Sequence, residues 1–196
     1  LPARFPLHDS LMFQILSYAL MNSNAAPLKK ALLDSGIAKD INYSFSTPLL
    51  QPVFTIELKN TSADRTDEFL RIVYDTLSGL AEKGLDPVDV EAAVNASEFK
   101  TLETLGGETG TTPKGLLLGL EMMEAWLYGD DAFERLRYEG LYDEIRKQIA
   151  GGALQRMIRE YLLDNPHIGL VALTPDTEMA AEAEAQPLEA EPGRKF

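Results

Sequence analysis

Apolar residues recur at helical spacing in the first long segment of the chain, from Asp9 to Met21. The stripe consists of Leu11, Met12, Ile15, Leu16, Ala19 and Leu20. This recurrence predicts a largely buried helix, with Asp9 or Ser10 available as its N-cap. A second, short helix is predicted from Pro27, which suits a first helical turn, to Gly36, which suits the position after a helix end.

The pattern then changes to strict alternation of apolar and polar residues. It runs from Ile41 to Ser46 and from Val53 to Leu58, on either side of a connection bounded by Pro48 and Pro52. Alternation predicts two strands, each with one buried and one solvated side. Because the connection is short, we expect an antiparallel pair.

The chain beyond this hairpin is predicted to form five helices and one more strand. The helices are Ser62–Lys83, Asp86–Gly106, Pro113–Gly129, Tyr142–Ile149 and Leu154–Leu163. Gly84 ends the first of them and Asp86-Pro87 begins the next. The strand is Ile168–Leu173, because Pro166 disfavours continuing the preceding helix. We expect Phe54, Ile56 and Leu58 of the hairpin to face Phe69, Ile72 and Val73 of the following helix.

The order of elements predicts an α+β fold, with an antiparallel or mixed sheet and helices packed on one face. Only three strands are clear. Ala3–Leu7 is a weaker fourth candidate because flanking prolines limit its ladder bonds, and a first strand upstream of Leu1 is the other possibility. We predict one domain over residues 1–176 and an acidic Ala/Glu linker or tail over 177–196.

Composition narrows the classes of function. The net charge of −13 argues against a nucleic-acid partner and makes basic peptides the favoured charged ligand. No apolar run reaches the roughly 20 residues that span a bilayer, so we expect no membrane partner. The absence of Cys fits a reducing compartment, so we expect a location in the cytoplasm or an organelle matrix, with a cysteine-free secreted protein as the alternative. Catalytic zinc motifs place two histidines close together, yet the chain has no Cys and only His8 and His167.

Several stretches resemble one known family. They are N-A-A-P-L-K-K-A-L-L-D-S-G at 24–36, G-L-D-P-V-D-V-E-A-A-V-N-A-S-E-F at 84–99, P-K-G-L at 113–116, W-L-Y-G-D-D-A-F-E-R-L at 126–136 and Y-L-L-D-N-P-H at 161–167. In their order and spacing they resemble the presequence-protease and falcilysin branch of the pitrilysin/insulinase superfamily of zinc metallopeptidases. Ala38 and Ala132 depart from the glycine and proline that the family pattern favours.

The resemblance implies a LuxS/mitochondrial-processing-peptidase-like metallohydrolase domain, specifically the second, non-zinc domain of the N-terminal half. It implies zinc in the catalytic domain of the parent protein and no cofactor in this chain, with other domains of the same polypeptide and peptide substrates as partners. We therefore expect a non-catalytic, chamber-forming domain of a zinc metalloendopeptidase that degrades short unfolded peptides. The alternatives are a domain of an inactive paralogue that acts as a scaffold or peptide-binding partner, and a free-standing peptide-binding module.

We predict no catalytic or metal-binding residue in this chain. The residues singled out for structural roles are Gly84, Asp86, Pro87, Trp126, Asn165, Pro166 and His167. His167 is expected to hydrogen-bond through its imidazole at a turn, and His8 to be exposed. Trp126 is interpreted as a core or inter-domain anchor, with substrate stacking as the alternative, and the neighbouring Met122 and Met123 as core filling. Asp130 and Asp131 are expected to cap the following helix rather than form an acid/base pair.

Overall fold

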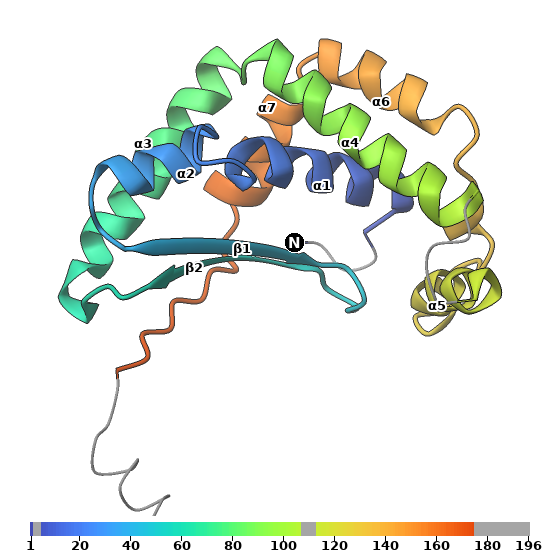
Figure 1. The fold of residues 1–196 in the computed structure, drawn as a ribbon, viewed down its shortest axis with the longest axis horizontal. Helices are drawn as coiled ribbons and strands as arrows, with labels where there is room; N and C mark the ends of the chain where they lie inside the picture. Colours follow the sequence, from blue (N-terminus) through green and yellow to red (C-terminus); the bar gives the residue numbers. More distant parts are fainter. Residues whose placement is uncertain (2–4, 107–112, 175–196) are drawn as a thin grey trace, which may run out of the picture.

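A two-stranded hairpin covered on one face by helices forms the framework of the protein (Figure 1). The computed structural model describes residues 1, 5–106 and 113–174. Strands β1 (Asp40–Ser46) and β2 (Val53–Lys59) pair antiparallel, with Tyr43 opposite Ile56. The α+β prediction, with helices on one side of an antiparallel sheet, is confirmed.

The hairpin has one apolar and one polar face. Ile41, Tyr43 and Phe45 lie opposite Leu58, Ile56 and Phe54, and all six are buried or half-buried against the core. The other face carries exposed residues, among them Asn42, Ser44, Thr55 and Glu57. This separation follows from the two-residue alternation of the sequence, because successive side chains on a strand point to opposite faces.

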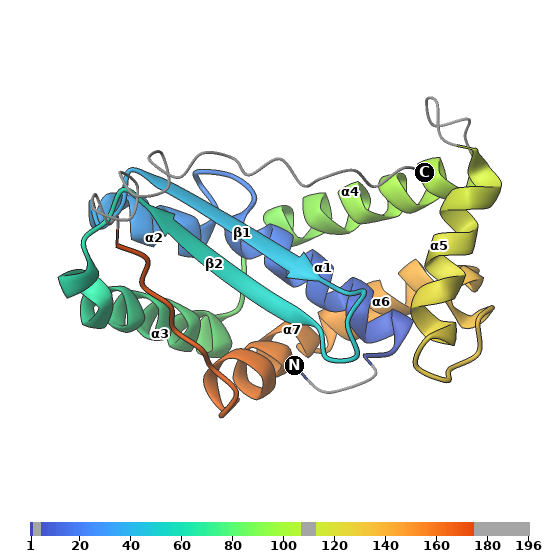
Figure 2. The ribbon, with the colours of Figure 1, turned by 90° about the horizontal axis from the view of Figure 1, so that it is seen from below.

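Helix α1 (Leu7–Met21) lies at the centre of the core. Phe13, Ile15, Leu16, Leu20 and Met21 are at most 1% exposed. The helix begins at Leu7, two residues before the predicted start at Asp9, and Pro6 is its N-cap residue. Asp9 and Ser10 therefore lie inside the first turn, and neither acts as a cap. Figure 2 shows the hairpin crossing in front of α1.

The remaining helices lie mostly on the α1 side of the hairpin, and the one over 114–126 lies at one end of the molecule. They are α2 (Pro27–Asp34), α3 (Thr66–Lys83), α4 (Pro87–Gly106), α5 (Lys114–Trp126), α6 (Leu141–Ala150) and α7 (Ala153–Met157), with short turns η1 (Ala63–Arg65) and η2 (Glu134–Leu136) and a π-helical turn η3 (Ile158–Leu163). The predicted stop and start signals act as expected, since Gly84 follows α3 at φ +83° and Pro87 opens α4.

The predicted contact between the hairpin and α3 needs correction. Phe54, Ile56, Leu58, Phe69, Ile72 and Val73 are all half-buried against one common core. The hairpin, however, lies chiefly against α1 and α2. Helix α1 is apolar on nearly every side, so it fills the space next to the sheet that the sequence interpretation assigned to α3.

The predicted strand at Ile168–Leu173 is not formed in the described residues. This stretch has no ladder partner, and Leu170, Val171 and Leu173 are exposed. Figure 2 shows it running on the side of the hairpin where β2 has its open edge. Leu7, the end of the weaker strand candidate, belongs to α1. The predicted linker at 177–196 lies outside the described residues, as does most of the loop after Gly106.

Candidate functional site

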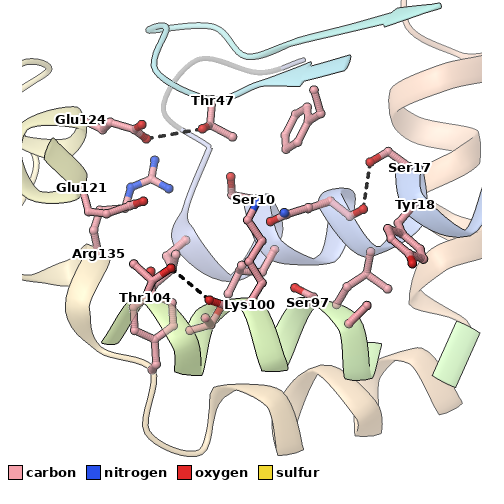
Figure 3. A pocket seen from close by; sticks show the side chains of 18 of the residues that line it. Ser10, Ser17, Tyr18, Thr47, Ser97, Lys100, Thr104, Glu121, Glu124 and Arg135 are labelled. Carbon is pink, nitrogen blue, oxygen red and sulfur yellow. Dashed lines mark hydrogen bonds between the residues drawn. The ribbon is translucent and has the colours of Figure 1, made fainter. Parts of the chain in front are cut away.

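A cavity opens between α1, α4, α5 and the end of β1. Its volume is about 530 Å³, which is within the range of ligand pockets. Four separate parts of the chain line it: one side of α1, the end of β1 together with Thr47, one side of α4, and α5 with the turn that follows it. Figure 3 shows side chains from these elements pointing into the same space.

Helix α5 supplies two carboxylates to the cavity, Glu121 and Glu124 (Figure 3). Thr47 Oγ1 donates a hydrogen bond to Glu124 Oε2 over 3.5 Å, which joins the end of β1 to α5. Burial raises the pKa of Glu124, and the nearby charge of Glu121 raises it further, although Arg135 and the bond from Thr47 act in the opposite direction. Glu124 therefore holds a proton more readily than a solvated glutamate.

Arg135 and Lys100 bring positive charge to the same cavity (Figure 3). Tyr138 also lines it, and burial, followed by the charge of Glu121, raises the pKa of Tyr138 to about 12. Its hydroxyl therefore stays protonated at neutral pH and is available as a hydrogen-bond donor.

A hydroxyl network supports the α4 wall of the cavity. Tyr142 on α6 shares hydrogen bonds with Ser97 Oγ at 3.0 Å and Thr101 Oγ1 at 2.8 Å. On the outer side of the same helices, the Arg146 guanidinium donates to Glu98 at 2.7 Å, Asn95 at 2.8 Å and Glu91 at 3.3 Å. These contacts fix α4 and α6 against each other, so the α4 side of the cavity is rigidly placed.

The side chains that line the cavity offer charges and hydrogen-bond donors and acceptors for binding a ligand. They include carboxylates, a guanidinium, an ammonium group and hydroxyls, but neither histidine. Among the described residues there is no cluster of three or more His, Asp or Glu that could hold a metal ion. The residues of this part of the chain therefore do not fit the zinc that the resemblance implies for the parent protein.

The residues singled out from the sequence do not gather in this cavity. Gly84, Asp86 and Pro87 form the joint between α3 and α4, where Asp86 Oδ1 accepts a hydrogen bond from Val88 N–H at 2.8 Å. Asn165 Oδ1 accepts from His167 N–H at 2.9 Å across the turn at Pro166. The His167 side chain is exposed, and its imidazole has no hydrogen-bond partner among the described residues, contrary to expectation.

Several interpretations of single residues also need correction. Met123 on α5 is 42% exposed, so it does not fill the core of the described structure. Trp126 is 71% exposed, which excludes the core interpretation and leaves its role as an inter-domain anchor as a prediction. His8 is half-buried within α1 rather than exposed, with Nδ1 3.0 Å from Asp9 Oδ1. Asp131 Oδ1 accepts a hydrogen bond from Phe133 N–H at 3.0 Å, but η2 itself begins at Glu134 without a side-chain cap, so the predicted capping role of Asp131 is not observed.

No local pattern in the sequence indicates the cavity. Its polar groups come from residues as far apart as Ser10 and Tyr138, and single polar residues on otherwise ordinary helices are usually solvated. Glu121 and Glu124 are three positions apart, which places them on one side of α5, but this spacing does not by itself indicate a cavity. No helix in the part of the chain that the structure describes is long and apolar enough to cross a membrane.

Comparison with known proteins identifies the family. The family model described as the peptidase M16 inactive domain matches residues 2–97. Protein HypA of Clostridium perfringens is 38% identical over 85% of this chain, and presequence protease 1 (chloroplastic/mitochondrial) of Arabidopsis thaliana is 33% identical over 92%. The chain spans only 17% of the length of each of these two relatives.

The fold agrees with this relationship. A solved structure from Bordetella pertussis Tohama I, described as a "putative zinc protease", superposes with a TM-score of 0.61 over 81% of each chain, at 18% identity. At that identity the likeness concerns the fold alone. Family match, relatives and fold together show that the chain belongs to the M16 peptidases, the pitrilysin/insulinase superfamily, as a relative of presequence proteases.

Proposed function

We propose that this chain is a non-catalytic domain that forms part of the peptide chamber of a zinc metalloendopeptidase, and that the parent protein degrades short unfolded peptides. The observation that carries the proposal is the match to the inactive domain of a peptidase family, in a chain 33% identical to a presequence protease over 92% of its length. In this proposal the zinc and its ligands belong to another domain of the same polypeptide, in the cytoplasm or an organelle matrix.

The cavity between α1, α4 and α5 gives this domain a contact surface for peptides. Peptides present backbone N–H groups, and basic ones add ammonium or guanidinium groups, all of which are donors. Glu121, Glu124 and the hydroxyl of Thr47 are acceptors in the cavity, while Arg135 and Tyr138 can donate to peptide carbonyls. A net charge of −13 also favours the approach of basic peptides.

The test uses the full-length parent protein and a fluorogenic peptide with a basic sequence. We expect turnover that a zinc chelator abolishes, and we expect the double variant Glu121→Gln/Glu124→Gln to raise KM for the basic peptide while kcat changes little. Loss of ground-state and transition-state binding together has this kinetic signature. The matched control is Asp67→Asn/Glu82→Gln, which removes two exposed carboxylates from α3.

Two outcomes would contradict parts of the proposal. Absence of chelator-sensitive turnover in the correctly folded parent would favour the inactive-paralogue alternative. An equal KM for both double variants would show that the cavity does not bind the peptide, although the domain assignment would stand.

Raising the ionic strength from 0.1 M to 1 M shortens the Debye length from roughly 10 Å to 3 Å, so the specificity constant for a basic peptide should fall more than that for a neutral peptide.

A further inference from the structure

Helix α5 carries its apolar side on the outside of the molecule. Four residues form a continuous outward stripe, with exposed fractions of 54% for Leu116, 47% for Leu120, 42% for Met123 and 61% for Leu127. Trp126 lies beside this stripe and is 71% exposed. Figure 1 shows α5 at one end of the molecule, where it packs against α4 and η2. These contacts leave the stripe exposed in the described structure.

The inward side of the same helix mixes charged and apolar residues. Glu121 and Glu124 point into the cavity, as Figure 3 shows, Leu118 also lines it, and Ala125 is buried. A surface helix normally turns its large apolar residues to the core and its carboxylates to water. Helix α5 instead directs two carboxylates inward and leaves four large apolar residues at the surface, and exposed apolar patches indicate interaction sites. We infer that the stripe is covered in the working protein.

We propose that the α5 stripe, Leu116–Leu120–Met123–Leu127, is the seat of a helix from another part of the same polypeptide. That helix would carry an apolar seam with basic residues beside it. The stripe residues are separated by four, three and four positions. This spacing is typical of helices that pack against a second helix, with the side chains of one fitting between those of the other. A single helix is therefore the shape that the stripe accommodates.

The negative charge of the segment around α5 favours a partner helix with basic residues. In residues 113–140, Glu121, Glu124 and Arg135 line the cavity, and Asp131 pairs with Arg137 at 2.9 Å. The other charged residues of this range are Asp130, Glu134 and Glu139 against Lys114, a balance of −2. A second copy of this chain would bring the same negative charge and the whole charge of −13 to the contact. Basic flanking residues would instead complement the seat.

The source of the helix is the remainder of the parent polypeptide. The chain spans 17% of the length of its two relatives described above. A covalently connected segment has a high effective concentration at the seat, so it outcompetes a separate protein of equal affinity. The proposal goes beyond the peptidase assignment, because it holds whether or not the parent protein cleaves peptides.

Thiol accessibility in the full-length parent tests whether the seat is covered. Leu120→Cys is introduced after replacement of the parent's own cysteines, and its maleimide labelling rate in native protein is divided by its rate in urea. We expect this ratio to be at least tenfold lower than that of the control Ser78→Cys on α3, which is also exposed in the described structure. Equal ratios would overturn the proposal. Leu116→Cys, one turn away, repeats the test if Leu120→Cys fails to fold.

A photo-crosslinker attached to the same cysteine identifies the occupant. We expect a crosslinked peptide from a helix of the same polypeptide that has basic residues next to its apolar seam. Crosslinks between the α5 helices of two molecules would show a second copy on the seat and overturn the proposal. Protection of the cysteine only after addition of a basic peptide would show a substrate surface instead, which also overturns it.

Discussion

Replacement of Phe13 by alanine is expected to remove much of the stability of the fold. Phe13 is fully buried, and its ring centroid lies 4.8 Å from that of Phe45, 5.6 Å from Phe54 and 6.1 Å from Phe5. The side chain thus joins α1 to both strands of the hairpin. Core Phe→Ala changes cost about 3–5 kcal/mol, and each aromatic pair adds about 0.5–1.5 kcal/mol beyond buried area. We expect a loss in the upper half of the first range.

Urea unfolding followed by far-UV circular dichroism measures this loss, with Phe99→Ala as the matched control. Phe99 is 63% exposed on α4, so its removal should change the free energy of unfolding by no more than about 0.5 kcal/mol. The comparison requires that both variants keep the wild-type m value, since a change in m indicates an altered denatured state or an intermediate. A cost for Phe13→Ala below about 1.5 kcal/mol, or equal to that of Phe99→Ala, would refute the central role given to this ring.

Three further predictions concern backbone, hydroxyl and carboxylate. Gly84→Ala should lower the free energy of unfolding by about 1–2 kcal/mol, because Gly84 has φ +83°. Gly79→Ala within α3 should raise it by about 0.5–1 kcal/mol, since nothing lies within 4 Å of an added Cβ. In thermal unfolding, the two variants should therefore shift Tm in opposite directions. Tyr142→Phe should cost about 1–3 kcal/mol in the same urea assay, because two hydroxyls lose their partner. Burial, and then the charge of Glu121, raise the pKa of Glu124 in the folded state. The ionised side chain therefore destabilises the fold, and the free energy of unfolding falls as the pH rises above 4.5, the pKa of Glu124 in the unfolded chain. Glu124→Gln should raise the urea midpoint at pH 7 and change it little at pH 4, and equal shifts at both pH values would contradict this.

Local signals in the sequence were sufficient for the parts of the fold that depend on neighbouring residues. Pro27 at the first position of α2, Gly84 after α3 and Pro87 at the start of α4 act through backbone geometry alone, and the structure places them as predicted. The alternation in β1 and β2 likewise determined which side of the hairpin is buried. These features need no knowledge of what packs on them.

The errors arise where the outcome depends on a distant partner. The periodicity of α5 correctly indicates a helix with one apolar side, but it cannot say whether that side meets this domain's core, and Met123 was therefore misplaced. Ile168–Leu173 has the composition of a strand, yet a strand exists only where another strand pairs with it. The cavity escaped prediction for the same reason, because Thr47 and Glu124 are 77 residues apart in sequence.

The extended segment at 168–173 sets how this chain behaves in concentrated solution. It is apolar, contains no proline, is largely exposed, and runs on the side where β2 has an open edge. Open edges and exposed extended segments are templates for pairing between molecules. Repulsion between molecules of charge −13 opposes such pairing at low salt. Because added salt screens that repulsion and leaves the apolar segment unchanged, we expect the isolated chain to associate first at this edge, and to do so faster as ionic strength increases.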